Sequence, residues 1–409
     1  MTLKIVLVVP SFPKTSETFI ANKFAALVAR GHNVKIVCNS SDPKEWKRFP
    51  NLDHPTLQKR VLVNFPTSPR WLVALLFPFV FLKTLIRRPA ATLHYIRRGW
   101  ALFGHGIIKR FYLDARLIAE QPNLIHFEFG ALAVNRTYLG KLLSCKILVS
   151  FRGYDLNFSG LDNPHYYADV WKHADAFHFL GRDLRNRALR RGCPPDKPYA
   201  LIPPAIDVER FKLPEKGRAQ DSTQRPLRLL SVGRLEWKKG HEYALQAVAY
   251  LVQWGIPVEY RIIGNGAYLQ AVAFTRHDLG LEKHVTLLGG LGADEVREQL
   301  AWADVFLHAA VSEGFCNAVI EAQAMQVPVV CTDADGLPEN VEDGATGFVV
   351  PRRDPHALAE KIAVLAADPA LRKRMGQAGR RRVIEKFGLA NQVEAFSQFY
   401  TQLLSGVNQ

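Results

Sequence analysis

The sequence has few cysteines, and their spacing excludes two classes of protein. The five are Cys38, Cys145, Cys193, Cys316 and Cys331, an odd number of widely separated residues with no Cys-x-x-Cys pair. A disulfide framework needs paired cysteines, and a structural zinc site needs closely spaced ones. The pattern therefore predicts neither of them, and we expect the protein to occupy a reducing compartment.

Long uninterrupted apolar runs are also missing. The amino-terminal run at residues 5–9 ends at Pro10, which is too short for a signal peptide and predicts a buried strand. The run at residues 71–82 is interrupted by Pro78 and is shorter than the ~20 apolar residues that cross a bilayer as a helix. We expect a cytoplasmic protein without a membrane-spanning helix.

Acidic residues are absent from residues 54–113, which contain ten lysines and arginines. The net charge of the chain is +15 at pH 7, and part of this excess is thus concentrated beside apolar runs. Such a pattern predicts helices bound peripherally to the anionic inner face of the cytoplasmic membrane, but a core helix with a solvated basic edge explains it equally well. No recognised nucleic-acid-binding motif accompanies the charge, so we expect no nucleic-acid partner.

Length and patterning predict two α/β domains. The 409 residues, 48% of them hydrophobic, are enough for two domains of roughly 200 residues each. Short apolar runs alternate with amphipathic stretches, which is typical of parallel βαβ units. Strands are expected at 5–9, 34–38, 124–127, 147–151, 227–232, 260–263, 285–288, 305–308 and 328–331. Helices are expected at 19–30, 241–254, 293–301 and 318–325.

A segment rich in Pro, Lys, Gln and Asp at residues 203–226 interrupts this alternation. We predict one doubly wound, Rossmann-like domain at residues 1–203 and a second at 204–388, with a helix at about 389–409 that crosses back to the first. Ligands of such sheets bind outside the carboxyl ends of the strands, so a cleft between the domains is the expected site.

Two cationic residues follow an expected strand of the second domain. Arg234 and Lys239 come after the strand at 227–232 and before the helix that starts near Gly240. A diphosphate placed there would meet helix N–H groups, the positive end of the helix dipole and two cations. The alternative is an ordinary strand-to-helix turn with solvated basic side chains.

Two glutamates, Glu313 and Glu321, are eight residues apart. Their spacing makes chemical sense if Glu313 lies in a loop and Glu321 on the first turns of the next helix. Gly314 would then let the backbone approach a ligand, and Glu321 would accept hydrogen bonds from the two hydroxyls of a ribose. The N–H groups expected to bind sugar hydroxyls are those of Phe315, Cys316 and Asn317.

These motifs together resemble the retaining glycosyltransferases of family 4, which have the GT-B architecture of two Rossmann-like domains. The matching motifs are Val-Gly-Arg-Leu-x-x-x-Lys-Gly at 232–240, Ile-Gly-Asn-Gly at 263–266, His-Val-Thr-Leu-Leu-Gly at 284–289, the pair of glutamates, and Asp-Gly-Leu-Pro-Glu at 335–339. Residues 10–20 resemble the subgroup that builds exopolysaccharide repeat units of the colanic-acid kind.

The resemblance implies a function and a set of residues. It implies transfer of a hexose from a UDP- or GDP-sugar to a lipid-linked or polysaccharide acceptor, with retention, by a front-side route and without a metal or another cofactor. Arg234, Lys239 and Glu313 would be catalytic, the two cations binding the diphosphate and the glutamate the sugar. The nucleotide-sugar-binding residues would be Gly233, Gly264, Leu288, Gly314, Phe315, Cys316, Asn317 and Glu321.

The first half departs from the family at two positions. Glu128 and Arg152 stand where many members have histidine, whereas His126 is kept and would be catalytic. We expect Glu128 to contact an acceptor hydroxyl, and Arg152 to bind a phosphate or an anionic acceptor. The alternative is that Arg152 only forms a structural ion pair with Asp155. The remaining acceptor-side candidates are Ser16, Glu17 and Asp155.

Two other functions stay open at this point, a nucleotide-sugar epimerase of the same fold and a module that binds a nucleotide or a membrane without chemistry. Asp333 and Asp335 imitate the metal-binding Asp-x-Asp of another glycosyltransferase fold, but they belong to the loop that leads into the 335–339 motif, so no metal site is expected. No Gly-x-Gly-x-x-Gly follows the first strand, which argues against a nicotinamide-dependent oxidoreductase.

Overall fold

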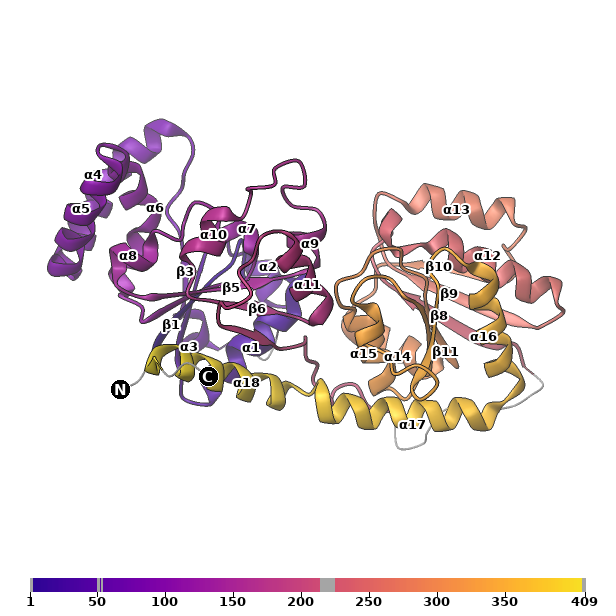
Figure 1. Cartoon of the computed structure of the whole chain (residues 1–409). Coiled ribbons are helices and arrows are strands. Elements are labelled where there is room, and N and C mark those ends of the chain that lie inside the picture. Colours follow the sequence, from indigo (N-terminus) through magenta and orange to yellow (C-terminus); the bar gives the residue numbers. More distant parts are fainter. Residues whose placement is uncertain (1–2, 50–51, 53, 214–224, 407–409) are drawn as a thin grey trace. The chain divides into compact units, whose positions relative to one another are not determined.

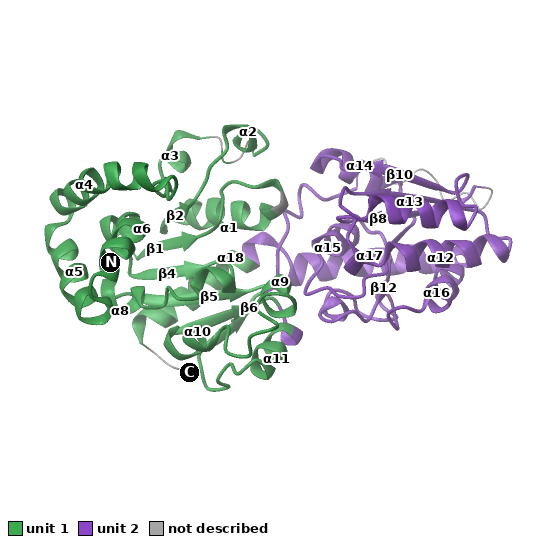
Figure 2. Ribbon diagram, turned by 90° about the horizontal axis from the view of Figure 1, so that it is seen from above, with its two compact units in different colours: residues 1–180, 184–202, 392–409 green, residues 181–183, 203–391 purple. Residues whose placement is uncertain are grey.

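The computed structural model describes residues 3–49, 52, 54–213 and 225–406, and its chain forms two compact units (Figures 1 and 2). Unit 1 comprises residues 1–180, 184–202 and 392–409, and unit 2 comprises residues 181–183 and 203–391. Each unit has its own parallel sheet with helices packed on it. The predicted architecture of two Rossmann-like α/β domains is confirmed. Of the predicted boundary segment and the predicted last helix, residues 214–224 and 407–409 lie outside the described residues.

The sheet of unit 1 has the strand order β3-β2-β1-β4-β5-β6-β7. All neighbouring strands are parallel. Its strands are β1 Lys4–Val8, β2 Asn33–Cys38, β3 Val61–Val63, β4 Leu124–Phe127, β5 Lys146–Phe151, β6 Ala176–Phe179 and β7 Tyr199–Leu201. β4 and β6 are buried at every position because helices cover both faces of a parallel sheet. This burial explains why the strands are continuous apolar runs in the sequence.

The helices of unit 1 connect the strands and include a three-helix insertion between β3 and β4. They are η1 Thr15–Glu17, α1 Thr18–Ala29, α2 Pro43–Trp46, α3 Pro55–Gln58, α4 Arg70–Arg87, α5 Pro89–Phe103, α6 Gly106–Glu120, α7 Gly130–Ala133, α8 Leu139–Leu143, α9 Gly153–Asn157, α10 Ala168–His173 and α11 Arg182–Arg190. The last helix, α18 Leu389–Ser405, belongs to unit 1 from Gln392 onward.

Helix α4 of the insertion is apolar on both sides. Its inner side packs on α6, where Val80 forms a buried cluster with Tyr112 and Ala115. Its outer side carries large apolar side chains that are between 56% and 73% exposed. These are Trp71, Leu75, Phe79, Leu82 and Ile86, which we call the apolar stripe. A solvated basic edge therefore does not describe the outer side of α4. None of the helices among the described residues combines the length and hydrophobicity that a membrane crossing requires.

The sheet of unit 2 has the strand order β10-β9-β8-β11-β12-β13, again entirely parallel. Its strands are β8 Leu227–Val232, β9 Val258–Ile263, β10 Val285–Gly289, β11 Val305–His308, β12 Val329–Thr332 and β13 Gly347–Val350. Its helices are η3 Trp237–Lys239, α12 His241–Gln253, α13 Leu269–Asp278, α14 Ala293–Trp302, α15 Asn317–Ala324, η4 Leu337–Glu339, α16 Pro355–Ala367 and α17 Pro369–Lys386. One buried apolar cluster includes residues of α12, α13 and α16, and a second includes residues of α14, α15 and α17. The sheet is thus covered on both faces, and its ligand site is left to the loops at the strand ends.

Candidate active site

Glycines bring the loops after β8 and β9 into close contact. A Cβ atom on Gly264 would lie 1.8 Å from the carbonyl oxygen of Gly233, and one on Gly266 would lie 2.1 Å from that of Leu235. Only glycine fits at such separations. The Gly-x-Gly motif therefore sets the backbone of the loop that carries Arg234.

Lys239, on the loop after β8, forms an ion pair with Glu313, on the loop after β11. Their side chains are 13% and 14% exposed. The two loops can approach because Gly240 follows the lysine with a φ of 61°, and a Cβ atom there would lie 2.1 Å from the carbonyl oxygen of Ala309. The structure thus joins two residues that the sequence predicted to be catalytic.

The pair is ionised at neutral pH. Burial alone would raise the pKa of Glu313, but the Lys239 ammonium and His308 lower the pKa to about 2. Burial alone would lower the pKa of Lys239, but the Glu313 carboxylate raises the pKa above its ordinary value. A partly buried cation at the start of a helix is suited to bind a phosphate.

His308, the last residue of β11, is a further member of this group that the sequence did not single out. Its Nε2 lies 3.5 Å from a carboxylate oxygen of Glu313, and its side chain is 4% exposed. Burial alone would lower the pKa of His308, but the sulfur of Cys316 and the Glu313 carboxylate raise the pKa to about 9. The sequence feature that pointed to His308 is its place at the carboxyl end of a predicted strand, where site residues gather.

Asp335 and Asn340 fix the loop that contains Glu313. The Asp335 carboxylate accepts hydrogen bonds from the Ser312 hydroxyl at 2.6 Å and from the N–H of Glu313 at 3.2 Å. The fully buried Asn340 accepts from the N–H of Cys316 at 3.3 Å and donates to its carbonyl oxygen at 3.1 Å. Within the described part of the chain, no hydrogen bond uses the N–H groups of Gly314, Phe315 or Asn317. These three donors are available to a ligand.

Glu321 lies on α15, partly buried, and is separate from the Lys239–Glu313 pair. No hydrogen bond or ion pair to its carboxylate is found among the residues that the structure describes. Burial raises its pKa to about 7, although Arg210 opposes the shift. A carboxylate without a protein partner is able to accept two hydroxyl groups, as the predicted ribose contact requires.

Leu288 and Arg234 lie at two other strand ends of unit 2. β10 is an edge strand, and its pairing with β9 shifts register between Leu287 and Gly289, so Leu288 has no residue opposite it. Such bulges leave backbone groups unpaired and occur beside active sites. The Arg234 side chain is 66% exposed, and its guanidinium pairs with Glu236 at 2.7 Å.

Among the described residues, the side chains of one cluster lie close enough together to hold a metal ion. The ligand atoms of His308, Glu313 and Cys316 all lie within 4.8 Å of one another. The Lys239 ammonium already bonds to that carboxylate.

The Asp-x-Asp sequence at residues 333–335 is engaged with an arginine. Asp333 and Asp335 lie 3.3 Å and 3.2 Å from the guanidinium nitrogens of Arg352. Both carboxylates thus pair with an arginine in the loop that leads into the 335–339 motif.

Unit 1 places Glu128 between two cations at the end of β4. The carboxylate is fully buried, forms an ion pair with Lys23, and accepts from Arg152 at 3.0 Å. Arg152 donates a further hydrogen bond from Nε to the carbonyl oxygen of Glu128 at 3.1 Å. Burial alone would raise the pKa of Glu128, but Lys23 and Arg152 hold it below its ordinary value. Glu128 thus organises two positive charges.

Asp155 contacts the backbone of Arg152 and not its guanidinium. Its carboxylate accepts from the N–H of Arg152 at 2.9 Å and from that of Ala131 at 3.1 Å. The predicted alternative of a side-chain ion pair between Arg152 and Asp155 is therefore wrong, since the guanidinium pairs with Glu128. The same guanidinium lies 3.9 Å from the centre of the Phe19 ring.

His126 is fully buried, and protein groups occupy both of its ring nitrogens. Nδ1 lies 2.8 Å from the hydroxyl of Tyr400 on α18, and Nε2 lies 2.6 Å from that of Ser150. Ser150 also bonds to His178 at 2.7 Å. Burial, followed by the charges of Lys23 and Arg152, lowers the pKa of His126 well below its ordinary value. The ring is neutral.

Ser16 and Glu17 lie in the 3-10 turn η1, before α1. The carboxylate of Glu17 forms an ion pair with Lys14 at 3.0 Å. Its negative charge also raises the pKa of Arg152 against the lowering effect of burial. Glu17, Glu128, Asp155 and Arg152 thus form one electrostatic group in unit 1.

Comparisons with known proteins agree with this architecture. Residues 214–382 match the family model described as glycosyl transferases group 1. The chain is 30% identical over 373 residues to the putative colanic acid biosynthesis glycosyltransferase WcaL of Salmonella typhimurium, covering 86% of this chain and 88% of that protein. It is 26% identical over 380 residues to the amylovoran biosynthesis glycosyltransferase AmsK of Erwinia amylovora, covering 90% and 92%.

The crystal structure of Anabaena HepE in complex with UDP-glucose has the same fold, with a TM-score of 0.72, 16% identity, and coverage of 98% of this chain and 100% of that one. Sequence similarity along most of the chain and the two Rossmann-like units lead to one conclusion: this chain belongs to the group 1 glycosyl transferases and has their GT-B fold.

Proposed function

We propose that the protein is a retaining glycosyltransferase of exopolysaccharide biosynthesis, which moves a hexose from a UDP- or GDP-sugar to a lipid-linked or polysaccharide acceptor. The observation that carries this proposal is the buried pair of Lys239 and Glu313 in the same unit as Glu321, for which the described residues supply no hydrogen-bond or ion-pair partner. The first gives a site for a diphosphate and a sugar, and the second gives a site for a ribose. The printed functions of the two relatives support the exopolysaccharide context.

The donor would lie along the carboxyl ends of the unit 2 strands. Its diphosphate would meet Arg234, Lys239 and the amino terminus of α12, where cations and helix N–H groups converge. The N–H groups of Gly314 and Phe315 would donate to the sugar hydroxyls, with the carboxylate of Glu313 accepting from another. The backbone at the Leu288 bulge would contact the base.

The energetic problem of the reaction is the charge that develops on the departing diphosphate. Lys239 remains a cation because Glu313 raises its pKa, and each such preorganised donor is worth about 3 kcal/mol of transition-state stabilisation. Glu313, with a pKa of about 2, holds no proton to give. The acceptor proton would therefore pass to the leaving phosphate oxygen as the C1–O bond to the acceptor forms on the face from which the diphosphate departs.

The side chains of Arg234 and Lys239 would supply the positive charge that a divalent metal supplies in other glycosyltransferases. We accordingly propose a metal-independent reaction, with Arg234 and Lys239 neutralising the diphosphate. The guanidinium of Arg234 pairs with the carboxylate of Glu236. When a diphosphate binds, Arg234 would leave this carboxylate and pair with a phosphate instead.

Two acceptor-side residues take on roles different from those first expected. Glu128 is buried between Lys23 and Arg152, so we propose that it holds the cations and does not itself touch an acceptor hydroxyl. His126 is likewise proposed as a positioning residue, since Tyr400 and Ser150 occupy its nitrogens. Of the residues around Glu128, the Arg152 guanidinium remains as the one that would contact an acceptor.

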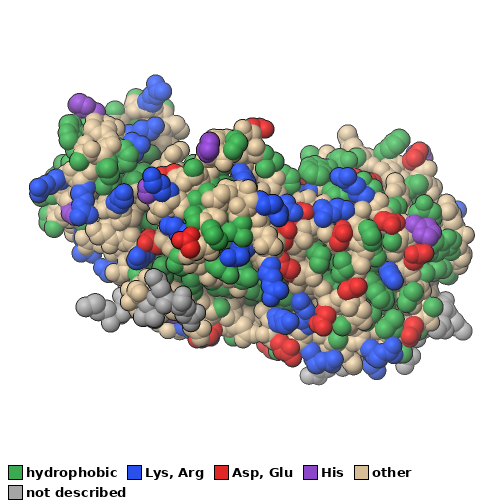
Figure 3. Space-filling view, viewed as in Figure 1, with side chains coloured by type: hydrophobic (Ala, Val, Ile, Leu, Met, Phe, Trp, Pro, Cys, Tyr) green, Lys and Arg blue, Asp and Glu red, His purple; other side chains and the backbone are tan. Residues whose placement is uncertain are grey.

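We also propose that unit 1 binds peripherally to the anionic inner face of the cytoplasmic membrane. The apolar stripe of α4 is exposed, and Figure 3 shows hydrophobic and basic side chains gathered over α4 and α5. Apolar side chains flanked by lysine and arginine are the pattern of helices that lie in the interface of anionic bilayers.

Product stereochemistry tests the proposed reaction. The protein would be incubated with UDP- and GDP-hexoses and a lipid extract of bacteria that make exopolysaccharide, and the anomeric proton of the new linkage measured by NMR. We expect the product to keep the donor's anomeric configuration and one nucleoside diphosphate to be released per linkage. An inverted linkage, or a new sugar isomer formed from donor alone, would contradict the proposal.

A further inference from the structure

A pocket of about 510 Å³ lies at the carboxyl edge of the unit 1 sheet, against helix α6. Asn39 and Asn64, which directly follow β2 and β3, line its inner wall, and Lys109 and Arg110 of α6 line it as well. Its volume falls within the range of about 300–1,000 Å³ that is typical of small-molecule sites. We call it the amide pocket.

The charges that line the amide pocket favour an anion. Asp114, its buried carboxylate, is already occupied by the hydroxyls of Tyr95 and Tyr138, at 2.9 Å and 2.7 Å, and by Arg136 at 3.0 Å. Arg136 is thereby neutralised. Lys109 and Arg110 form no ion pair with a carboxylate in the described part of the chain. Two uncompensated cations remain, and the Arg110 guanidinium is held 3.9 Å from the centre of the Phe103 ring.

The inner wall offers an acceptor for a neutral group. The Nδ2 of Asn64 donates to Asn39 at 2.9 Å, but its Oδ1 is buried and has no hydrogen-bond partner in the described structure. A buried carbonyl oxygen that lacks a donor costs free energy unless a ligand or water supplies one. A turn of the Asn64 amide would present this oxygen to a sugar hydroxyl beside a bound phosphate, and the hydroxyl would satisfy it.

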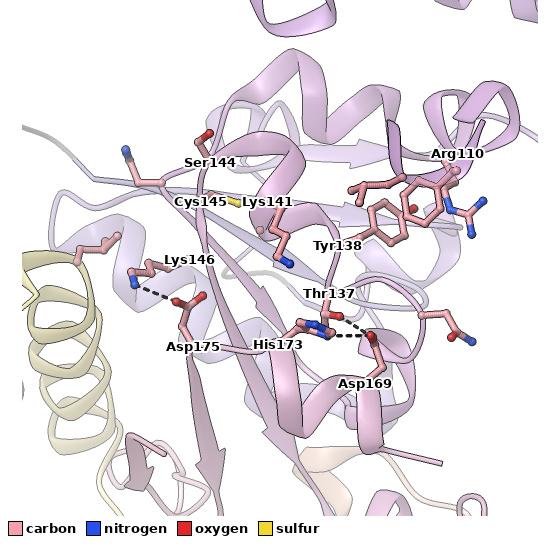
Figure 4. Close-up of a pocket in the computed structure, with 16 residues that line it drawn as sticks. Arg110, Thr137, Tyr138, Lys141, Ser144, Cys145, Lys146, Asp169, His173 and Asp175 are labelled. Atoms are coloured by element: carbon pink, nitrogen blue, oxygen red, sulfur yellow. Dashed lines mark hydrogen bonds and ion pairs between the residues drawn. The ribbon is translucent and has the colours of Figure 1, made fainter. Parts of the chain in front are cut away.

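A larger cavity next to the amide pocket, of about 780 Å³, is the weaker candidate for an anion (Figure 4). It shares Arg110, Asn135 and Tyr138 with the amide pocket. Acidic residues already engage two of its basic side chains: Lys146 pairs with Asp175 at 2.9 Å, and His173 bonds to Asp169 at 3.0 Å, as the dashed lines in Figure 4 show. Of the cations in this cavity that the amide pocket does not share, Lys141 is the one for which the described structure gives no acidic partner.

We propose that the amide pocket binds the diphosphate of a lipid-diphosphate-linked acceptor, with Lys109 and Arg110 on the phosphates and Asn64 Oδ1 on a hydroxyl of the first sugar. The inference rests on the proposed function and chooses one of its two acceptor classes. The lipid is favoured over a soluble polysaccharide because Phe65 and Leu113 line the same pocket. In addition, α6 packs on α4, whose outer side is the apolar stripe.

Titration calorimetry with geranyl diphosphate and with inorganic pyrophosphate tests the inference. The parent protein would carry Arg234→Ala and Lys239→Ala, so that the donor site does not bind the probes. Adding Lys109→Gln and Arg110→Gln should weaken geranyl diphosphate binding by about tenfold or more, since charge-assisted contacts are lost. Adding Lys141→Gln, which removes a cation from the neighbouring cavity alone, should leave the affinity unchanged. Pyrophosphate should bind about tenfold more weakly than geranyl diphosphate, because it has no apolar part to bury.

If Lys109→Gln with Arg110→Gln weakens geranyl diphosphate binding no more than Lys141→Gln does, the amide pocket is not the binding site. If pyrophosphate binds as tightly as geranyl diphosphate, the assignment of a lipid-linked acceptor is wrong. The unfolding midpoint of each variant would be measured first, so that only folded proteins are compared. Nucleotide binding by the wild-type protein distinguishes failure of the pocket assignment from failure of the proposed function. If wild type binds UDP or GDP but the parent variant does not bind geranyl diphosphate, the pocket assignment fails and the proposed function stands.

Discussion

The ammonium group of Lys239 is hydrogen-bonded to the carboxylate of Glu313, 74 residues further along the chain. Because both side chains are largely buried, removing the Lys239 ammonium leaves the Glu313 carboxylate with His308 as its remaining neighbour of opposite charge. Lys239→Ala should lower the free energy of unfolding by about 3 kcal/mol and kcat by about a hundredfold. The double variant with Glu313→Gln should recover stability but not activity. Urea unfolding at pH 7 and nucleotide release measure the two effects.

The same pair has a signature in the pH dependence of stability. The folded-state pKa of Glu313 is lowered to about 2 from 4.5, so its contribution is complete above pH 4.5 and is lost as the pH falls toward 2. The stability difference between wild type and Glu313→Gln should shrink over that window. Lys238→Ala is the matched control, since its ammonium pairs with Glu236 at 3.1 Å and not with Glu313. If Lys238→Ala lowers the free energy of unfolding as much as Lys239→Ala does, the assignment of this effect to the Lys239–Glu313 pair is contradicted.

Glu321 should control donor affinity in a pH-dependent way. Its pKa is raised to about 7, so the ionised form that accepts ribose hydroxyls is lost as the pH falls through 7. We expect the donor KM of wild type to rise below pH 7, and Glu321→Gln to have a KM raised about tenfold or more at pH 8 with little change in kcat. Because the acid form is favoured on folding, the variant should also be the more stable protein above pH 7. A KM of wild type that does not vary with pH would argue against the ribose contact.

The proposed reaction needs no divalent metal. Activity of protein dialysed against EDTA should equal that of untreated protein, and adding Mg²⁺, Mn²⁺ or Zn²⁺ should not increase it. Cys316→Ser provides the control for the cluster of His308, Glu313 and Cys316, because it removes the metal-binding sulfur and keeps the volume similar. Activity that disappears with EDTA, returns with Zn²⁺ and is absent in Cys316→Ser would establish a metal site.

The apolar stripe should bind anionic membranes. In vesicle flotation, we expect the protein to float with vesicles rich in phosphatidylglycerol, to float less at high salt, and to stay at the bottom with neutral vesicles. Serine at Trp71, Leu75 and Phe79, which are all more than half exposed, should abolish flotation without lowering the unfolding midpoint. Serine at the similarly exposed Phe274 of unit 2 is the control. Flotation that does not depend on the stripe would contradict this role.

Local sequence patterns predicted the scaffold well. β4, β8 and β11 have the predicted bounds, and α12 begins at the predicted His241. Such segments are continuous apolar runs because parallel strands are buried on both faces. The short strands β3, β6, β7 and β13 were missed. β3 and β7 have three residues each, too few to produce a recognisable run.

Contacts between residues far apart in the sequence could not be predicted from local patterns. Nothing local indicates that Glu128 is buried against Lys23, 105 residues away, or that Tyr400 bonds to His126 across 274 residues. The substitution of a usual histidine by Glu128 therefore suggested an acceptor contact, whereas packing makes it the partner of two cations. The meeting of the loops after β8 and β11 was easier to predict, because glycines and charged residues directly follow strands, where the topology of a parallel sheet gathers them at one edge.

Unit 2 is proposed to bind a nucleotide sugar through Lys239 and Glu321, and a thermal-shift titration with UDP, GDP and their hexose conjugates measures this binding. A ligand at a hundred times its Kd stabilises the folded state by about 2.7 kcal/mol. We predict that UDP or GDP raises the unfolding midpoint of wild type, that AMP does not, and that Lys239→Ala and Glu321→Ala lose the response. A wild-type protein that responds to none of these nucleotides, or variants that respond as wild type does, would contradict the account.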